Sequence, residues 1–243
     1  MGERPVYNFL RLFKKGVYLA QPWQTIEMVD TADGVLELRR RGERDYIILV
    51  NNRVLMNSSA NRSEIALGEL ACAMVISRPH PLVLVGGLGM GLTLRAVLDS
   101  LSPSARVEVV ELNPAVITWC KGPLAGLTNN ALNDARVSIK LDDVAAIIAK
   151  ASQPVAHKFD AIIIDLYEGP HSGTDGINDP FYGRRALKAT TAALASNGVF
   201  AVWGEAPNRA FEKRLTAAGF SVTVQRPGRG GLRHVVYIAQ KKL

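Results

Sequence analysis

The chain has few cysteines and no pattern that marks a disulfide-rich or zinc-binding protein. Its 243 residues include only two cysteines, Cys72 and Cys120, which lie far apart and form no C-x-x-C pair. Disulfide-stapled domains and structural zinc sites need several cysteines at short spacings. A disulfide framework and a metal site are therefore not expected, and the chain suits a reducing compartment.

Long apolar runs are also missing. A helix that spans a bilayer needs roughly 20 apolar residues, and the longest runs here, Leu70–Ile76 and Ala161–Ile164, have the length of core segments. Charged residues near the N-terminus interrupt any signal-peptide core. We expect a cytoplasmic protein that does not bind membranes. Residues 9–15 fit a short amphipathic surface helix, and a membrane anchor there is the less favoured alternative.

Aromatic residues are scarce, at 7% of the chain, while the formal net charge is +7. A basic surface attracts nucleic acid, but such surfaces usually interleave basic and aromatic side chains. Here the basic residues are spread along the sequence, so nucleic-acid binding is disfavoured. The hydrophobic content of 48% suffices for the core of one or two globular domains.

The first part of the chain predicts a β-meander followed by a helix. Four short β-type runs are separated by turn residues: Thr25–Val29, Val35–Arg39, Tyr46–Val50 and Arg53–Met56. Asn51 and Asn52 suit a tight hairpin turn, because Asn tolerates positive φ. A helix is expected over 61–77, and Pro79 ends it. We therefore expect one domain over residues 1–78 and a second over residues 79–243.

From residue 82 on, strand-like and helix-like segments alternate. The expected strands are Leu82–Val85, Arg106–Glu111, Val137–Leu141, Phe159–Asp165 and Gly198–Trp203, with helices over 90–101, from Pro114, over Val144–Ala151, 180–195 and 206–218. This alternation predicts the α/β class with a doubly wound, mostly parallel sheet. Two last strands, Phe220–Gln225 and His234–Ala239, close the seven-stranded sheet as an antiparallel hairpin. This half resembles the Rossmann-like fold of class I S-adenosylmethionine (SAM) methyltransferases.

A glycine-rich turn follows the first of these strands and opens a helix, and such a turn lets a ligand approach the backbone closely. Its residues are Gly86, Gly87, Leu88, Gly89 and Gly91. Glu111 ends the next strand, 111 − 91 = 20 residues beyond the last glycine. A carboxylate at that place accepts hydrogen bonds from ribose hydroxyls. The two features together predict an adenosine-type cofactor, with Leu112 as a further contact.

The spacing of the glycines distinguishes between cofactors. The dinucleotide pattern G-x-G-x-x-G fails from every starting glycine, whereas G-x-G-x-G from Gly87 to Gly91 suits SAM-type ligands. NAD is kept as a minor alternative. The third strand ends in Asp142 and Asp143, over the expected adenine position. One of them could accept from the adenine amino group while the other caps the next helix.

The fourth strand ends in Asp165, and Glu168 follows three residues on. Ligands in open α/β sheets bind outside the carboxyl ends of the strands. Two carboxylates there could hold an amine and deprotonate it for attack on a sulfonium-activated carbon. Tyr167 and His171 are expected near the acceptor, although a solvated loop suits them nearly as well, and residues 172–180 could form a lid.

The fifth strand ends near two further candidates. Trp203 and Glu205 could flank the substrate, and a plain core position is the alternative for Trp203.

Several of these segments resemble the spermidine synthase (polyamine aminopropyltransferase) family. Residues 86–91 are similar to its G-G-G-D-G-G turn, residues 110–117 to its V-E-I-D-x-x-V-I segment, and residues 165–170 to its D-S-S-D-P loop. The resemblance implies decarboxylated SAM or SAM as the donor, a small-molecule amine as the acceptor, and a homodimer. It implies that Asp165 is the base, Glu168 helps to hold the acceptor, Glu111 binds the ribose and Asp142 binds the adenine.

Two positions depart from the family pattern. Leu88 stands where the family has an Asp that faces the amino end of decarboxylated SAM, and Leu67 stands where it has a Tyr that lines the polyamine pocket. Leu88 removes a counter-charge for an ammonium group, and it also removes a repulsion that would exclude the carboxylate of SAM.

The expected function is therefore transfer of an aminopropyl-type group from a SAM-derived sulfonium to a small amine. A SAM-dependent methyltransferase that acts on a small molecule is the alternative. A catalytically inactive module that only binds the nucleoside is less favoured.

Overall fold

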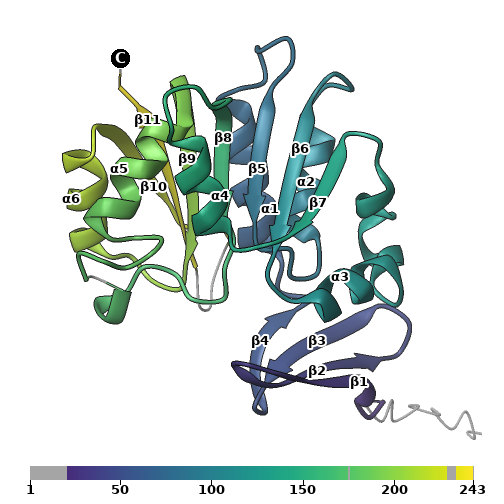
Figure 1. The fold of residues 1–243 in the computed structure, drawn as a ribbon. Helices are drawn as coiled ribbons and strands as arrows, with labels where there is room; N and C mark the ends of the chain where they lie inside the picture. Colours follow the sequence, from purple (N-terminus) through teal and green to yellow (C-terminus); the bar gives the residue numbers. More distant parts are fainter. Residues whose placement is uncertain (1–20, 175, 229–233, 243) are drawn as a thin grey trace, which may run out of the picture.

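The computed structural model describes residues 21–174, 176–228 and 234–242 (Figure 1). The predicted amphipathic segment 9–15 lies outside the described residues. Within the described ranges, no helix is both long enough and apolar enough to cross a membrane.

Sheet A is the predicted β-meander. Its four antiparallel strands follow one another in chain order: β1 (Gln24–Thr31), β2 (Gly34–Arg41), β3 (Asp45–Val50) and β4 (Arg53–Asn57). The hairpin between β3 and β4 turns at Asn51 and Asn52, which have φ of 47° and 62°. Both values lie in the left-handed region that Asn tolerates, which confirms the predicted turn.

Sheet B is the predicted seven-stranded sheet, with the order β10-β11-β9-β8-β5-β6-β7. Its strands are β5 (Leu82–Gly86), β6 (Arg106–Glu111), β7 (Val137–Leu141), β8 (Phe159–Ile164), β9 (Leu194–Gly204), β10 (Phe220–Gln225) and β11 (Val235–Lys241). Strands β5 to β9 pair in parallel, and β11 pairs antiparallel with both β9 and β10. The mostly parallel α/β sheet and its closing hairpin are thereby confirmed.

Helices cover both faces of sheet B (Figure 1). They are α1 (Arg62–Ala73), α2 (Leu92–Ser100), α3 (Pro114–Lys121), α4 (Val144–Ala151), α5 (Arg184–Ala193) and α6 (Arg209–Ala217). One buried core contains side chains of α1, α2 and α3 together with β2 and β3 of sheet A. The other contains side chains of α4, α5 and α6. The apolar β5 and β8 contribute to both cores, as expected for central parallel strands.

Helix α1 packs closely on α2. A side chain at Gly68 would come within 2.8 Å of the Ala96 Cβ and 2.9 Å of the Thr93 carbonyl oxygen. Glycine therefore permits the two helices to approach each other. Although the sequence groups this helix with the β-meander, α1 forms part of the helical layer on sheet B. The domain boundary between residues 78 and 79 stays a prediction.

Sheet A lies next to the end of sheet B at which the loop after β5 emerges (Figure 1). The Trp119 indole N–H of α3 donates to Glu27 Oε2 of β1 at 2.5 Å, and the Tyr46 hydroxyl of β3 donates to the Pro123 carbonyl at 2.9 Å. The Met90 N–H lies 3.2 Å from the sulfur of Met56. The first two contacts join sheet A to α3 and the residue pair after it, and the third places β4 against the loop after β5.

Several segments differ from the sequence-based expectation. The helix expected over 61–77 ends at Ala73, and β9 begins at Leu194, inside the helix expected over 180–195. Residues 123–135, for which no element was predicted, contain two short 3-10 turns at Ala125–Thr128 and Ala131–Asn133. Helix α5 begins at Arg184 rather than at Pro180, because the Asp179 side chain accepts from the N–H groups of Phe181 and Tyr182 and forms a turn there.

Candidate active site

The glycine turn after β5 is shaped by close contact with its neighbours. Gly87, Gly89 and Gly91 have φ of 88°, 51° and 78°. A side chain at Gly87 would collide with the carbonyl oxygen of Asp165 at the end of β8. Only glycine fits this conformation and this spacing without strain. The turn therefore lies directly beside the β8 end, as the strand order of sheet B requires.

Glu111 fixes the opposite side of the turn. Its Oε2 accepts from the Leu88 N–H at 2.9 Å, and its Oε1 accepts from the Asn113 N–H at 2.8 Å. Each carboxylate oxygen has a further lone pair. The side chain is thus held in place and can still accept from ribose hydroxyls.

The structure distinguishes between the two roles, adenine contact and helix cap, that the sequence left open for Asp142 and Asp143 after β7. Asp143 caps α4, because its side chain accepts from the Ala145 N–H at 2.8 Å. Asp142 accepts from the Asp143 N–H at 2.8 Å, and this bond, ahead of Lys150, lowers the pKa of the Asp142 carboxyl. Leu112 is 68% exposed. An exposed apolar side chain near a carboxylate suits a flat aromatic base.

The Asp165 side chain is partly exposed and is bound by a residue of helix α2 rather than by its own loop. Thr93 Oγ1 of α2 donates to Asp165 Oδ2 at 2.5 Å and also lies 3.1 Å from the Glu64 carbonyl oxygen of α1. Burial, and then the charge of Glu64, raise the pKa of Asp165 to about 7, while the Thr93 hydrogen bond lowers it. A carboxyl group with a pKa near 7 is a suitable general base at neutral pH.

Four residues around Asp165 were missed by the sequence analysis: Ser63, Glu64, Thr93 and His234. Ser63 and Glu64 are only 5% and 6% exposed. Ser63 donates to Glu64 Oε2 at 2.7 Å, and its hydroxyl lies 3.0 Å from His234 Nδ1. The available signal was the position of a Ser-Glu pair on the inward side of α1, whose other buried residues are Leu67, Gly68, Ala71 and Cys72, because polar groups are unusual on such a side.

The loop after β8 turns Glu168 away from this cluster. Glu168 Oε1 lies 3.7 Å from His171 Nε2, and both side chains are about half exposed. The Tyr182 hydroxyl donates to the Glu168 carbonyl at 2.9 Å and anchors the loop. Tyr167 is 53% exposed. Asp165 and Glu168 therefore have different partners, although they are separated by only three residues.

Glu168 lines a pocket of about 640 Å³ between the loops that follow β8 and β9. Arg53 of β4, His171, Glu205, Asn208 and Arg209 also line this pocket. Arg53 lies 3.9 Å from Glu205 Oε1. The pocket is thus rich in charges of both signs and contains three of the predicted acceptor residues.

Trp203, at the end of β9, lies beside the Asp165 cluster. Its ring is 4.8 Å from that of His234, in an edge-on arrangement. Its indole N–H is buried and has no hydrogen-bond partner among the described residues. A buried donor without a partner is uncommon in folded proteins, so this group is suited to a polar ligand.

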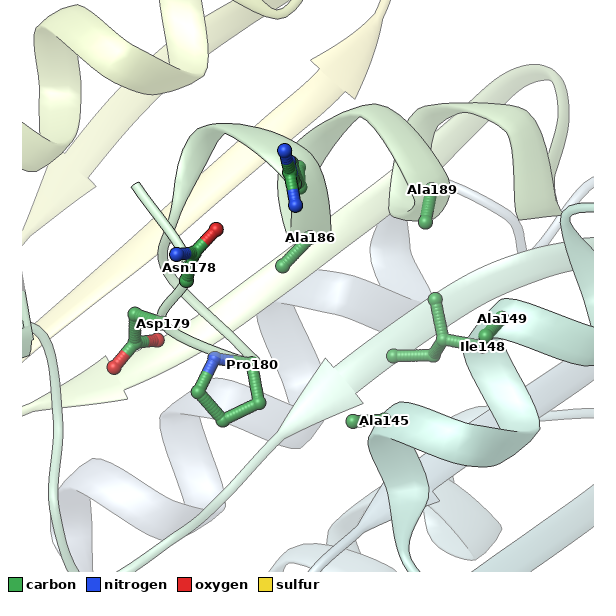
Figure 2. A pocket seen from close by; sticks show the side chains of 9 residues that line it. Ala145, Ile148, Ala149, Asn178, Asp179, Pro180, Ala186 and Ala189 are labelled. Carbon is green, nitrogen blue, oxygen red and sulfur yellow. The ribbon is translucent and has the colours of Figure 1, made fainter. Parts of the chain in front are cut away.

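A second pocket, of about 410 Å³, lies between α4 and α5 (Figure 2). Its walls are mostly small or apolar, with Ala145, Ile148, Ala186 and Ala189 facing one another. None of its lining residues was predicted as a site residue, and the Asp179 side chain there is occupied by the turn before α5.

Comparison with known proteins identifies related sequences. The family model described as the spermine/spermidine synthase domain matches residues 70–216. A polyamine aminopropyltransferase of Ruegeria sp. is 33% identical over 119 residues, which are 48% of this chain and 40% of that protein. One of Clostridium tetani is 31% identical over 134 residues, 54% of this chain and 43% of that protein. The aligned part thus spans less than half the length of these relatives.

The solved structures show the same fold. A crystal structure of a spermidine synthase in complex with the transition state analogue AdoDATO matches with a TM-score of 0.71 and 18% identity. The match covers 90% of this chain and 72% of that one.

Proposed function

Because the chain belongs to the spermine/spermidine synthase domain family, we propose that it transfers an aminopropyl group from decarboxylated SAM to a small amine. The observation that carries this proposal is the place of Asp165. Its backbone touches the glycine turn at Gly87, while its carboxyl group has a pKa raised to about 7. A base thus stands beside the part of the sheet on which a nucleoside would bind.

The residues of the glycine turn would hold the donor nucleoside. Each oxygen of Glu111 accepts one backbone N–H, which fixes the side chain, and has a second lone pair. With these lone pairs Glu111 would accept hydrogen bonds from the ribose hydroxyls. Asp142 and the exposed Leu112 would contact the adenine. Asp143 supports this part of the site by capping α4.

The acceptor amine would approach from the side of the loop after β8. Asp165 would take a proton from the attacking ammonium, and the freed amine would displace the thioether from the carbon bound to sulfur. Positioning and proton removal are the two contributions that an enzyme makes to such a displacement. Glu168, His171 and Glu205 would hold the rest of the acceptor, because they line the charged pocket. Trp203 would contribute its unpartnered indole N–H, and Tyr167, next to Glu168 and 53% exposed, would lie at the side of the acceptor.

One observation favours a second candidate, transfer from intact SAM. Leu88 is 3% exposed and belongs to the apolar core next to α2. It therefore offers no counter-charge to the ammonium of decarboxylated SAM and no repulsion to the carboxylate of SAM. A methyltransferase with the same nucleoside site is the function that this residue would suit.

Product analysis distinguishes the two functions. The purified chain is incubated with a primary diamine such as 1,4-diaminobutane and with either decarboxylated SAM or SAM. Aminopropyl transfer releases methylthioadenosine from the decarboxylated donor, whereas methyl transfer releases S-adenosylhomocysteine from SAM. Formation of methylthioadenosine supports the proposal, and formation of S-adenosylhomocysteine supports the methyltransferase instead. If neither compound forms, both functions are contradicted.

Two further parts of the proposal concern assembly and location. A homodimer, as the family resemblance implies, is expected in sedimentation experiments, and a single-chain mass would contradict it. A cytoplasmic location stays a prediction.

A further inference from the structure

Helix α1 brings a second carboxylate to the site. Glu64 is buried on the inner side of this helix, whereas Glu69 of the same helix is exposed. A buried carboxylate is rare unless hydrogen bonds hold it. Here Ser63 donates to Glu64 Oε2 at 2.7 Å, and His234, next to β11, lies 3.0 Å from the Ser63 hydroxyl.

Thr93 links this carboxylate-bearing helix to Asp165. Its hydroxyl lies 2.5 Å from Asp165 Oδ2 and 3.1 Å from the backbone carbonyl of Glu64. Gly68 permits this arrangement, since any side chain there would push α1 away from the Thr93 carbonyl. The close packing of α1 on α2 therefore sets the position of Glu64 relative to Asp165.

Glu168 does not occupy this position. It lines the charged pocket and lies near His171. The negative charge that acts on Asp165 thus comes from Glu64 of α1, 165 − 64 = 101 residues earlier in the chain, and not from the loop that follows β8.

We propose that Glu64 and Asp165 act as one carboxylate pair that receives the proton of the attacking amine, with Glu64 as a positioning residue that is held by the Ser63 hydroxyl. This inference rests on the proposed function. An acceptor that binds as R–NH3+ gives one proton to the pair and becomes R–NH2. Its nitrogen then forms a bond to the carbon of the donor sulfonium. The carbon–sulfur bond breaks, its electron pair stays on sulfur, and the neutral thioether nucleoside leaves beside a secondary ammonium product.

The physical reason is the cost of placing two negative charges near each other when one of them, on Glu64, is buried. A nearby negative charge makes a carboxyl group hold its proton more strongly than it would alone. Several elements contribute groups near the pair. Thr93 of α2 contacts Asp165, Ser63 of α1 contacts Glu64, and Tyr182 before α5 is close enough for the charge of Asp165 to raise its pKa. His234 before β11 contacts Ser63, and Trp203 of β9 packs on His234. The charge of Glu64 raises the pKa of Asp165, and the Thr93 hydroxyl opposes this shift.

The first test is the pH dependence of transfer in three variants, measured with decarboxylated SAM and 1,4-diaminobutane. For Glu64→Gln we expect the acidic limb of the rate profile to move to lower pH and the plateau rate to fall about 3- to 10-fold, since a weaker base remains. Glu64→Asp keeps the charge and should keep the limb near that of the unmodified chain. Glu69→Gln, on the exposed side of α1, should leave both quantities unchanged.

An acidic limb at the same pH in Glu64→Gln and in the unmodified chain would overturn the proposal, whatever the plateau rate. If Glu64→Gln does not fold, Ser63→Ala takes its place, because it removes the bond that holds Glu64. It should move the limb in the same direction by a smaller amount, and an unmoved limb overturns the proposal equally.

A second readout does not need activity. Carbon-13 NMR follows the titration of the Asp165 carboxyl carbon, which is assigned by its loss in Asp165→Asn. Its midpoint should fall in Glu64→Gln and stay in Glu69→Gln. If the midpoint falls but no transfer occurs with any donor, the pair exists and the proposed function is wrong. If transfer occurs and the midpoint does not fall, the pair is wrong and the function stands.

Discussion

The nucleoside side and the amine side of the candidate site are built in different ways. On the nucleoside side, the backbone defines the geometry: the glycine turn, the end of β6 at Glu111 and the cap at Asp143 are all local features. On the amine side, side chains from α1, α2, β8 and the segment before β11 meet through tertiary packing. The geometry of the glycine turn therefore depends mainly on backbone conformation, whereas the geometry of the amine side depends on contacts between side chains.

Among the variants considered, Gly87→Ala should disturb the nucleoside side of the site most strongly. The new Cβ would collide with the Asp165 carbonyl in a backbone conformation that alanine rarely adopts. We expect a loss of about 2–4 kcal/mol in the free energy of unfolding together with loss of donor binding. Chemical denaturation and calorimetry measure the two effects. Gly126→Ala is the matched control, because nothing lies within 4 Å of a side chain there, and its values should equal those of the unmodified chain.

Glu111→Ala should weaken donor binding without unfolding the protein. It removes the proposed ribose acceptor and leaves the N–H groups of Leu88 and Asn113 without their partner. We expect a loss of about 1–3 kcal/mol in the binding of a SAM-type donor, or about 5- to 150-fold in Kd. Glu108→Gln on the same strand, which pairs with Lys140, is the control. Equal donor affinity in both variants would remove Glu111 from the nucleoside site.

Asp165→Asn tests the amine side through stability. The pKa of Asp165 is raised to about 7 in the folded protein, so its contribution to stability is fully present below the unfolded pKa near 4 and is lost as the pH rises through 7. Asparagine carries no charge. The variant should therefore gain stability over the unmodified chain on going from pH 5 to pH 8, by about 1–3 kcal/mol. A difference between the two chains that does not change with pH would show that Asp165 titrates normally.

Thr93→Val tests the amine side through the hydrogen bond between Thr93 and Asp165, and its expected free-energy effect is the smallest of the four variants. It removes the hydrogen bond that lowers the pKa of Asp165, so the pKa should rise and the acidic limb of the rate profile should move to higher pH. This direction is opposite to that expected for Glu64→Gln. Loss of one hydrogen bond should cost about 1 kcal/mol of stability. Thr118→Val, at an exposed position of α3, is the control. An acidic limb that moves to lower pH in Thr93→Val would contradict the assignment.

The sequence predicted the two sheets, the closing hairpin and the Asn51-Asn52 turn because these follow from hydrophobic period and turn chemistry, which are local. It also predicted where Glu111 and Asp165 lie, since strand ends meet at one edge of a parallel sheet. It did not predict that Glu64 of α1 rather than Glu168 would act on Asp165. That pairing depends on how closely α1 packs on α2 at Gly68, and no periodicity reports the distance between two helices.

Dependence on tertiary packing also explains why the start of helix α5 was predicted wrongly. Helix α5 begins four residues late because the Asp179 side chain forms a turn with Phe181 and Tyr182. The sequence shows that Asp179 can accept hydrogen bonds, but several N–H groups lie within its reach. Which of them it binds is decided by the packing of the loop on its neighbours.

The most direct measurement of the central claim compares the unmodified chain with Asp165→Asn, using decarboxylated SAM and 1,4-diaminobutane, with donor affinity measured by calorimetry on both. Asp99→Asn, at an exposed position of α2, is the matched control. We predict that methylthioadenosine formation falls by about 100-fold or more in Asp165→Asn, with donor affinity unchanged. Full transfer activity in Asp165→Asn would contradict the claim that Asp165 receives the proton of the amine.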